Sequence, residues 1–269
     1  MGAAEAAQAA GLIVHRIARA DFNHGTTRQQ AIEQFAADAD VVVFLTQDAV
    51  LTEPASLQQL VDAFDDPTVA ATYGRQLPHP DATPVAAHAR QFNYPAVGHT
   101  RRWADVPEFG IKTCFLSNSF AAYRGEALMA VGGFPVHVIF AEDMFAVAKM
   151  LLAGWKVAYA GNAQCRHSHN YTLVEEFERY FDIGVFHVRE PWIRENFGGA
   201  GGEGMRYVKS ELRFLGLRRL YLWPGAIVRN AVKLFAYKLG QQEARLPIGI
   251  KRKLGMYKRY WDGPFAFQL

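Results

Sequence analysis

A run of five apolar residues, Val41 to Leu45, is the feature that most constrains the fold of this chain. Four of the five are valine or phenylalanine, which is typical of a short strand buried on both faces, as in a parallel sheet. The run stops abruptly at Thr46, Gln47 and Asp48. Because the carboxyl ends of strands border the ligand crevice in open α/β sheets, we expect Gln47 and Asp48 at its lip.

A carboxylate at the lip of such a crevice can hold a divalent cation, which in turn can hold a diphosphate. Asp48 is therefore a candidate metal ligand, although acidic residues after strands are also ordinary loop chemistry. His167 and His169 follow another predicted strand, Trp155 to Tyr159. Two residues apart in an extended segment, they point the same way, but a His-x-His pair alone is a weak metal signal.

The elements around the Val41 run alternate between strand and helix. Turn chemistry and apolar spacing predict the following elements: a strand over Leu12–Ile17, a helix opened by a capping box at Thr27 and Gln30, a helix over Ser56–Phe64 and a strand over Val69–Tyr73. Alternation with short connections favours an α/β fold built on a parallel sheet.

The middle of the chain is less regular. Residues 74–109 contain several prolines, and so long an irregular stretch is usually functional or mobile. Arg75 could reach an anionic ligand from it. Lys112 to Leu116 predicts another strand, which ends at Ser117 and Asn118, whose hydroxyl and amide groups suit a polyol. A simple turn explains these two residues equally well.

Two adjacent acids, Glu142 and Asp143, begin a helix whose apolar residues recur at helical spacing through Leu151. The helix dipole favours their ionised forms, and acids at a helix start more often serve that purpose than catalysis. The apolar segment before them, Ile139 to Ala141, would however place both carboxylates beside the crevice rather than on the outer surface.

Charge divides the chain into two parts. From Arg206 to Tyr260 there are 14 Lys and Arg against the two acids Glu211 and Glu243, a net charge of +12, so the remainder carries −9 of the overall +3. The glycines at 198–202 are flexible enough for a linker, so we expect a domain over residues 1–200 and a basic helical extension over 203–269.

The basic extension mixes Leu, Phe, Tyr and Trp with spaced cations, which suits helices lying at an anionic membrane surface. A helical hairpin packed on the core and a basic oligomer interface are the alternatives. No recognition motif accompanies the charge, so we expect no nucleic-acid partner. The start of the chain lacks a basic segment followed by an apolar core, and no uncharged apolar run reaches about 18 residues, so neither a signal peptide nor a membrane span is expected.

With half of its 269 residues hydrophobic, the chain can bury a sizeable core. Cysteine is scarce, with only Cys114 and Cys165 and neither in a CxxC pair, which favours a reducing compartment over a disulfide framework. We therefore expect a cytoplasmic protein, with the basic extension allowing peripheral attachment to the inner face of the plasma membrane.

Several segments together resemble the family 2 inverting glycosyltransferases, and most closely the bacterial rhamnosyltransferases. Their order and spacing carry the resemblance: Phe44–Ala49, Tyr73–Gln76, Gly132–Phe134, Phe140–Asp143, His167–His169 and Tyr180–Gly184. The resemblance implies an α/β GT-A fold, the Rossmann-like, mostly parallel sheet of nucleotide-diphospho-sugar transferases, with a C-terminal helical extension. Family members begin with a further strand and an acidic loop, so about 40 to 50 residues of that kind are missing before Met1.

The resemblance also implies roles for particular residues. Asp48 would hold Mg²⁺ or Mn²⁺ and, through it, the donor diphosphate, with His169 in preference to His167 completing the site. Thr46 stands where the family's Asp-x-Asp motif has its first Asp. Asp143 would be the general base that removes the proton from the acceptor hydroxyl, and Glu142 would orient it.

The remaining implied roles concern the two substrates. The residues expected on the donor side are Asn23, Gly25, Arg28, Gln47 and Arg75, and those expected on the acceptor side are Ser117, Asn118 and Trp192. The implied reaction moves L-rhamnose from dTDP-rhamnose to a hydroxyl of a polysaccharide or lipid-linked saccharide, with inversion, in cell-envelope assembly.

Two other functions stay open from the sequence. The chain could be a catalytically inactive, degenerate transferase that docks on a membrane or on partner proteins. It could also be a metal hydrolase that uses His167 and His169, although a third ligand would then have to come from Asp48 or Asp143.

Overall fold

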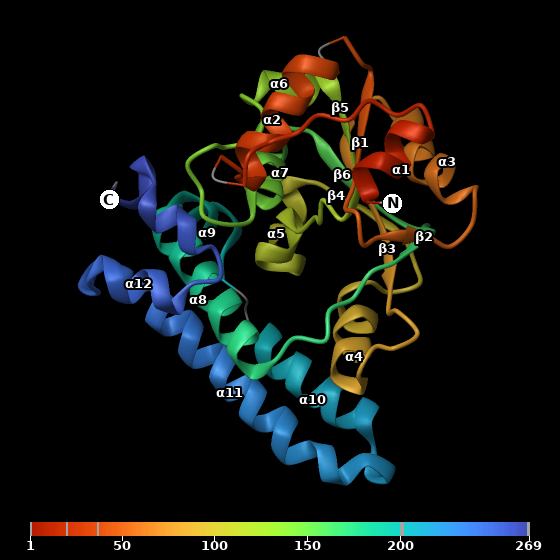
Figure 1. The fold of residues 1–269 in the computed structure, drawn as a ribbon. Helices are drawn as coiled ribbons and strands as arrows, with labels where there is room; N and C mark the ends of the chain where they lie inside the picture. The colour runs from red at the N-terminus through yellow and green to blue at the C-terminus, as the bar shows by residue number, and fades with distance from the viewer. Residues whose placement is uncertain (1, 20, 37, 200–201, 268–269) are drawn as a thin grey trace.

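A mixed six-stranded sheet lies at the centre of the fold (Figure 1) in the computed structural model, which describes residues 2–19, 21–36, 38–199 and 202–267. Its strands are β1 (Val41–Leu45), β2 (Val50–Leu51), β3 (Val69–Leu77), β4 (His99–Arg101), β5 (Phe120–Arg124) and β6 (Lys156–Arg166). The strand order is β1-β5-β3-β6-β2, and β4 pairs with β6 outside this path.

Strand directions follow from the pairing registers. β3 and β6 are parallel, with Tyr73 opposite Tyr159, whereas β5 is antiparallel to both β1 and β3. β1, β3 and β6 therefore run in one direction, as expected for a Rossmann-like core, and β5 reverses between β1 and β3. β2 and β4 pair antiparallel with β6 and complete the mixed sheet.

Three strand predictions are wrong. β1 is not buried on both faces in a parallel arrangement, because it ends the sheet order and, within the described residues, pairs only with the antiparallel β5. Leu12–Ile17 forms no strand, and Leu12 and Ile13 are 62% and 82% exposed. Lys112–Leu116 is also not a strand, because a 3₁₀ helix occupies Gly110–Cys114.

Helices cover the sheet and extend beyond one end of it (Figure 1). The α-helices are α1 (Ala3–Ala9), α2 (His24–Phe35), α3 (Ser56–Val61), α4 (Pro84–Asn93), α5 (Val106–Phe109), α6 (Gly125–Ala130), α7 (Glu142–Leu152), α8 (Leu173–Arg189), α9 (Pro191–Phe197), α10 (Glu203–Leu215), α11 (Trp223–Gly240) and α12 (Ile248–Leu254). Among the described residues, none of these helices is long and apolar enough to cross a bilayer.

The start of a helix depends on which side chain accepts hydrogen bonds from the free backbone N–H groups of the first turn. The predicted capping box at Thr27 is wrong, because Asn23 accepts from Thr26 N at 3.0 Å and α2 already begins at His24. α8 begins with a capping box: Glu175 N donates to Thr172 Oγ1 at 3.2 Å, and Thr172 N donates to the Glu175 carboxylate at 2.8 Å.

Residues 74–109 are more regular than predicted. β3 continues to Leu77, and α4, β4 and α5 occupy much of the rest. Thr83 caps α4, accepting from Ala86 N, and Pro84 occupies the first turn, where a missing N–H costs nothing. The helix also buries His88 against the C-terminal helices, an interaction that local patterns do not reveal.

The C-terminal helices pack closely on the rest of the protein. α8 and α11 cross at Gly184 and Gly240, where a Cβ on Gly240 would lie 2.1 Å from the carbonyl oxygen of Phe181. Asp182 accepts from Met256 N and Tyr257 N, both at 2.9 Å, which ties the segment after α12 to α8. α10 and α11 form a helical hairpin, which the sequence had left as an alternative to helices at a membrane surface. The predicted linker falls partly on residues 200–201, outside the described residues.

Candidate active site

A cavity of about 1200 Å³ lies at the carboxyl ends of β1 and β6. Gln47 and Asp48, which follow β1, line it as expected from their position after the strand. The first turns of α2 and α7 and one face each of α4, α8 and α11 form the other walls. Asp48, His169 and Asp143, from three distant parts of the sequence, therefore share one cavity.

Asp48, His167 and His169 form a cluster suited to a metal ion. Their potential ligand atoms lie within 4.8 Å of one another. The Asp48 Oδ2 atom is 3.3 Å from His167 Nε2 and 3.6 Å from His169 Nε2. The resemblance to the family favoured His169 over His167 as the second metal ligand. In the structure, His167 lies at least as close to Asp48 as His169 does.

Gln76 fixes the orientation of His167. Its amide oxygen lies 2.8 Å from His167 Nδ1 and can only accept, so Nδ1 carries the proton and Nε2 presents its lone pair to Asp48. The same oxygen accepts from Arg90 at 2.6 Å, and the Gln76 amide nitrogen donates to Ser117 at 3.0 Å. Such an outer partner typically holds a metal-binding imidazole in its ligating tautomer.

The charges in the cluster suit cation binding. Burial lowers the pKa of His167 to about 4 and also lowers the pKa of His169, so both imidazoles are neutral near pH 7. Burial pushes the pKa of Asp48 upward, but the neighbouring Thr46 hydroxyl and the two imidazoles outweigh it and leave this pKa below its usual value. An ionised carboxylate and two neutral imidazoles fit a divalent cation.

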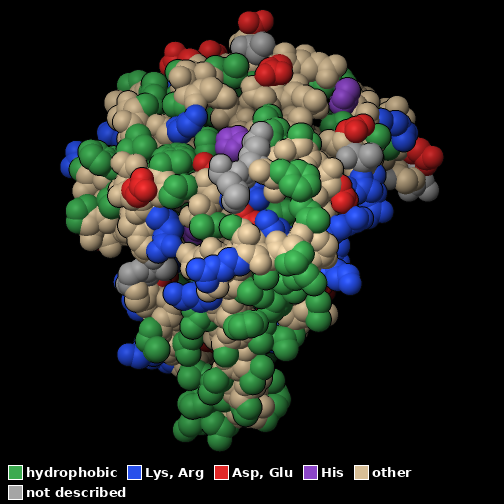
Figure 2. All heavy atoms as spheres, turned by 90° about the vertical axis from the view of Figure 1, so that its left-hand side faces the viewer, with side chains coloured by type: hydrophobic (Ala, Val, Ile, Leu, Met, Phe, Trp, Pro, Cys, Tyr) green, Lys and Arg blue, Asp and Glu red, His purple; other side chains and the backbone are tan. Residues whose placement is uncertain are grey.

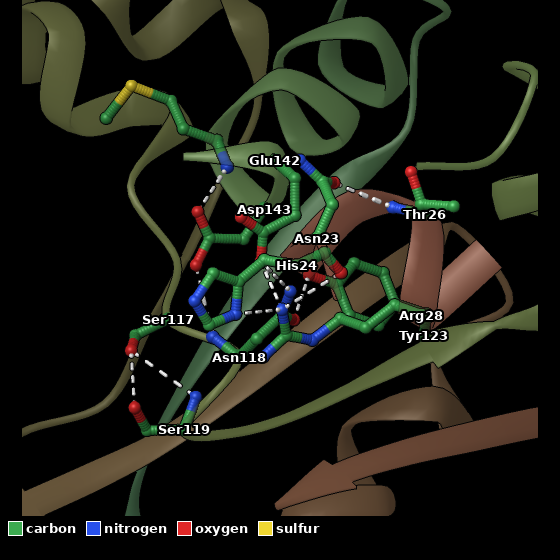
Figure 3. Close-up of polar contacts among 11 residues, drawn as sticks. Asn23, His24, Thr26, Arg28, Ser117, Asn118, Ser119, Tyr123, Glu142 and Asp143 are labelled. Atoms are coloured by element: carbon green, nitrogen blue, oxygen red, sulfur yellow. Dashed lines mark hydrogen bonds and ion pairs between the residues drawn. The ribbon is translucent and has the colours of Figure 1, made fainter. Parts of the chain in front are cut away.

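Glu142 and Asp143 begin α7 on another wall of the cavity (Figure 3). Their turn starts at Ala141, the only non-glycine residue with positive φ in the described ranges, at φ 57° and ψ 40°. A non-glycine residue in the left-handed region costs about 1 kcal/mol or more and is common where a site must be held in one geometry.

Glu142 is held by a chain of polar contacts (Figure 3). Arg28 donates to its Oε1 at 2.6 Å, and the Asn118 amide donates to the same oxygen at 3.2 Å. Tyr123 donates in turn to the Asn118 amide oxygen at 2.7 Å. These partners hold the buried Glu142 carboxylate in one orientation beside Asp143.

Asp143 has the opposite character. Backbone N–H groups of Asn118 and Met144 donate to its two oxygens at 3.2 and 2.8 Å, but no side-chain cation contacts it in the described chain. Burial and the neighbouring Glu142 carboxylate raise the pKa of Asp143 to about 7. A carboxylate with this pKa can both accept and release a proton near neutral pH.

Four of the residues expected at the site do not line the cavity. Asn23 caps α2, and Gly25 is buried where a Cβ would meet the Pro135 carbonyl oxygen at 1.9 Å. Arg75 donates to the carbonyl oxygen of Tyr94 at 3.3 Å. Trp192 donates to Glu190 at 2.9 Å and packs edge-on against Phe145. By contrast, Arg28, Gln47, Ser117 and Asn118 are all at the cavity.

Other cavity residues escaped the sequence reading. Arg179 on α8 lies over the Phe140 ring, with its guanidinium carbon 4.7 Å from the ring centroid. On the side of the C-terminal helices, Arg229 and Lys233 of α11 pair with Glu176 at 3.0 and 3.2 Å and also line the cavity. The sequence predicted helices in this region but gave no sign that these two cations face the cavity.

The chain matches the glycosyltransferase-like family 2 over residues 3–181. It belongs to this family. Relatives include the O-antigen chain rhamnosyltransferase RfbN of Salmonella typhimurium strain LT2, 54% identical over 243 residues, 90% of this chain and 77% of the relative. WbaN of Salmonella anatum, also an O-antigen chain rhamnosyltransferase, is 51% identical over 247 residues, 91% of this chain and 78% of the relative.

Two solved structures align with most of this chain. The mannosyltransferase PcManGT from Pyrobaculum calidifontis, in complex with GDP-Man and Mn²⁺, has a TM-score of 0.49 and 18% identity, with 93% of this chain and 67% of that chain covered. TarS 1–349 of S. aureus, in complex with UDP-GlcNAc, has a TM-score of 0.42 and 14% identity, with 90% and 77% covered.

Family membership removes one of the functions left open by the sequence, the metal hydrolase. This family 2 chain is a glycosyltransferase, and it has the expected α/β fold with a helical C-terminal region. The metal-hydrolase reading of His167 and His169 is therefore set aside, while the metal-binding geometry of the two histidines stands.

Proposed function

We propose that this enzyme transfers L-rhamnose from dTDP-rhamnose to a hydroxyl of a lipid-linked O-antigen saccharide, with inversion at the anomeric carbon. The observation that carries the proposal is the shared cavity, in which a cation-binding cluster at Asp48 and a separate carboxylate of raised pKa, Asp143, are present together. The identity to two O-antigen chain rhamnosyltransferases supports the choice of sugar.

Asp143 is proposed as the general base. Displacement with inversion needs one group that removes the proton from the attacking hydroxyl, and a pKa of about 7 is well matched to that task near neutral pH. Glu142 contributes through its fixed charge, which helps to raise the pKa of Asp143. Ser117 and Asn118 lie beside Asp143 and offer polar groups for an acceptor sugar.

Asp48, His167 and His169 are proposed to hold the divalent cation, which when bound supplies positive charge to the departing diphosphate. Two imidazoles favour Mn²⁺ over Mg²⁺, because Mg²⁺ is bound mainly by oxygen ligands. Arg28 and Arg179 add fixed positive charge at the same cavity and would stabilise a bound nucleotide diphosphate.

Incubation of the purified enzyme with dTDP-rhamnose, Mn²⁺ and a lipid-linked saccharide tests the proposal. We expect release of dTDP and a product whose anomeric configuration, read by NMR, is opposite to that of the donor. Asp66→Asn is a control for Asp143→Asn, because Asp66 is an exposed carboxylate away from the cavity.

Loss of turnover in Asp143→Asn with retention in Asp66→Asn supports the proposed base. A well-folded wild-type protein that neither binds dTDP in the presence of Mn²⁺ nor releases it would instead favour a non-catalytic docking protein. Retention of the donor configuration in the product would contradict single displacement.

A further inference from the structure

The turn between α10 and α11 carries an unusual group of exposed apolar side chains. Leu217, Leu220 and Tyr221 are 81%, 52% and 77% exposed. The first half of α11 continues the surface with Ile227 and Val228, both 51% exposed. Figure 2 shows hydrophobic side chains gathered over the lower end of the molecule, which in Figure 1 is formed by α10 and α11.

α11 carries large apolar side chains on its exposed side. Its inward face is buried at Ala226, Lys233, Ala236 and Gly240, residues spaced for one side of a helix packed on α8. The opposite face would normally be polar, yet it carries Ile227, Val228, Leu234 and Phe235, the last two 60% and 62% exposed. We name Leu217, Leu220, Tyr221, Ile227, Val228, Leu234 and Phe235 the apolar face.

Exposed cations flank the apolar face along residues 204–242. Arg218 and Arg219 lie in the turn itself, and Lys238 follows on α11; all three are exposed. The only acid between residues 204 and 242 is Glu211, which is buried and accepts from Asn230 at 2.6 Å. The surface is therefore apolar at its tip and positively charged at its borders.

We propose that the apolar face binds an anionic lipid bilayer, with Leu217, Tyr221 and their neighbours inserted at the headgroup level. Exposed apolar groups with a border of Arg and Lys are what an interfacial membrane-binding element requires. A second copy of this chain fits less well, because a symmetric contact would bring Arg218 and Arg219 against the same cations of the partner.

The position of α11 connects this surface with the reaction, an argument that rests on the proposed function. Leu222, Ala226 and Arg229 line the active-site cavity, while Tyr221, Ile227 and Val228, their neighbours in sequence, are exposed on the apolar face. Only the thickness of this helix separates the bilayer from the cavity. A saccharide carried on a membrane lipid would therefore need to reach only a short distance above the headgroups.

Vesicle flotation with the full chain tests the proposal without any substrate. We expect binding to vesicles of phosphatidylcholine with phosphatidylglycerol, weaker binding as salt is raised, and little binding to phosphatidylcholine alone. Leu217→Ser with Tyr221→Ser should weaken binding by about tenfold or more, and Arg218→Gln by about fivefold.

The chain offers a matched control. Ile13 and Val97 are 82% and 77% exposed, against 81% and 77% for Leu217 and Tyr221, and they lie outside the apolar face. Ile13→Ser with Val97→Ser should bind vesicles like the wild type. The proposal would be overturned if the wild type did not bind vesicles, or if both double variants bound them equally. It would also be overturned if sedimentation showed a dimer that Leu217→Ser with Tyr221→Ser dissociates.

Turnover separates this proposal from the proposed function. Leu217→Ser with Tyr221→Ser should keep the wild-type rate of dTDP release with a water-soluble saccharide acceptor and lose rate only when the acceptor is embedded in vesicles. The two proposals can fail separately. If neither the wild type nor any variant turned over substrate, but the wild type bound vesicles and Leu217→Ser with Tyr221→Ser bound them more weakly, the proposed reaction would be contradicted and membrane binding would stand.

Discussion

Replacing Asp143 by Asn should make the protein more stable at high pH and much less active. The pKa of Asp143 rises from 3.8 to about 7 on folding, because burial and Glu142 oppose its ionised form. Between these two values the folded state holds a proton that the unfolded state releases, so wild-type stability falls as pH rises and levels off above pH 7. Below about pH 4 both states are protonated and the penalty disappears.

The magnitude follows from the shift, since each pKa unit corresponds to 1.36 kcal/mol. A shift of this size gives a total penalty of about 4 kcal/mol, of which about 2 to 3 kcal/mol develops between pH 5 and pH 8. Asp143→Asn carries no such penalty. As the pH rises from 5 to 8, the free energy of unfolding of Asp143→Asn minus that of the wild type should therefore increase by about 2 to 3 kcal/mol. The increase is smaller where water in the cavity solvates the wild-type carboxylate.

Urea unfolding at pH 5 and pH 8 measures this difference. Asp66→Asn is the control: the hydrogen bonds with Thr68 hold the pKa of Asp66 at about 2, so its effect should be the same at both pH values. In the same variants, kcat should rise with pH through about 7 for the wild type and Asp66→Asn, and fall by about 10² to 10⁴ for Asp143→Asn. A stability difference independent of pH would refute the argument from burial.

Three further predictions concern the metal cluster and the helix crossing. Gln76→Leu removes the acceptor that fixes the His167 tautomer, so calorimetry should show about 10- to 100-fold weaker Mn²⁺ binding, whereas unchanged affinity would contradict its positioning role. Treatment with EDTA should abolish turnover and added Mn²⁺ should restore it; full activity without metal would count against the cluster. Gly240→Ala places a methyl group against the Phe181 carbonyl and should cost about 1 to 3 kcal/mol or more in thermal unfolding, while Gly249→Ala, in open space, should not.

The convergence of Asp48, Asp143 and the histidines could be anticipated from the sequence because each follows a strand or begins a helix. Strand ends and helix starts meet at one edge of an α/β sheet, so residues there become neighbours even when they are distant in sequence. The helical C-terminal region could also be anticipated, since helices depend largely on local spacing, and α10, α11 and α12 form it.

Features that depend on pairing could not be anticipated. Apolar residues at β1 indicate a strand but not its partner, so its edge position and the reversed β5 were missed. The contacts of Gln76 with His167 and of Arg28 with Glu142 join residues 91 and 114 positions apart. The cavity wall supplied by Arg229 and Lys233 likewise arises from tertiary packing, which a helical pattern of charges does not determine.

The central claim is that Asp48 and Asp143 serve one cavity in different roles. Titration calorimetry of dTDP in the presence of Mn²⁺ tests it most directly, with wild type, Asp48→Asn and Asp143→Asn compared under identical conditions. We expect Asp48→Asn to bind dTDP at least tenfold more weakly and Asp143→Asn to bind it as wild type does while lacking turnover. The division of roles would be contradicted if Asp48→Asn bound dTDP as tightly as the wild type does. It would also be contradicted if Asp143→Asn lost as much dTDP affinity as Asp48→Asn.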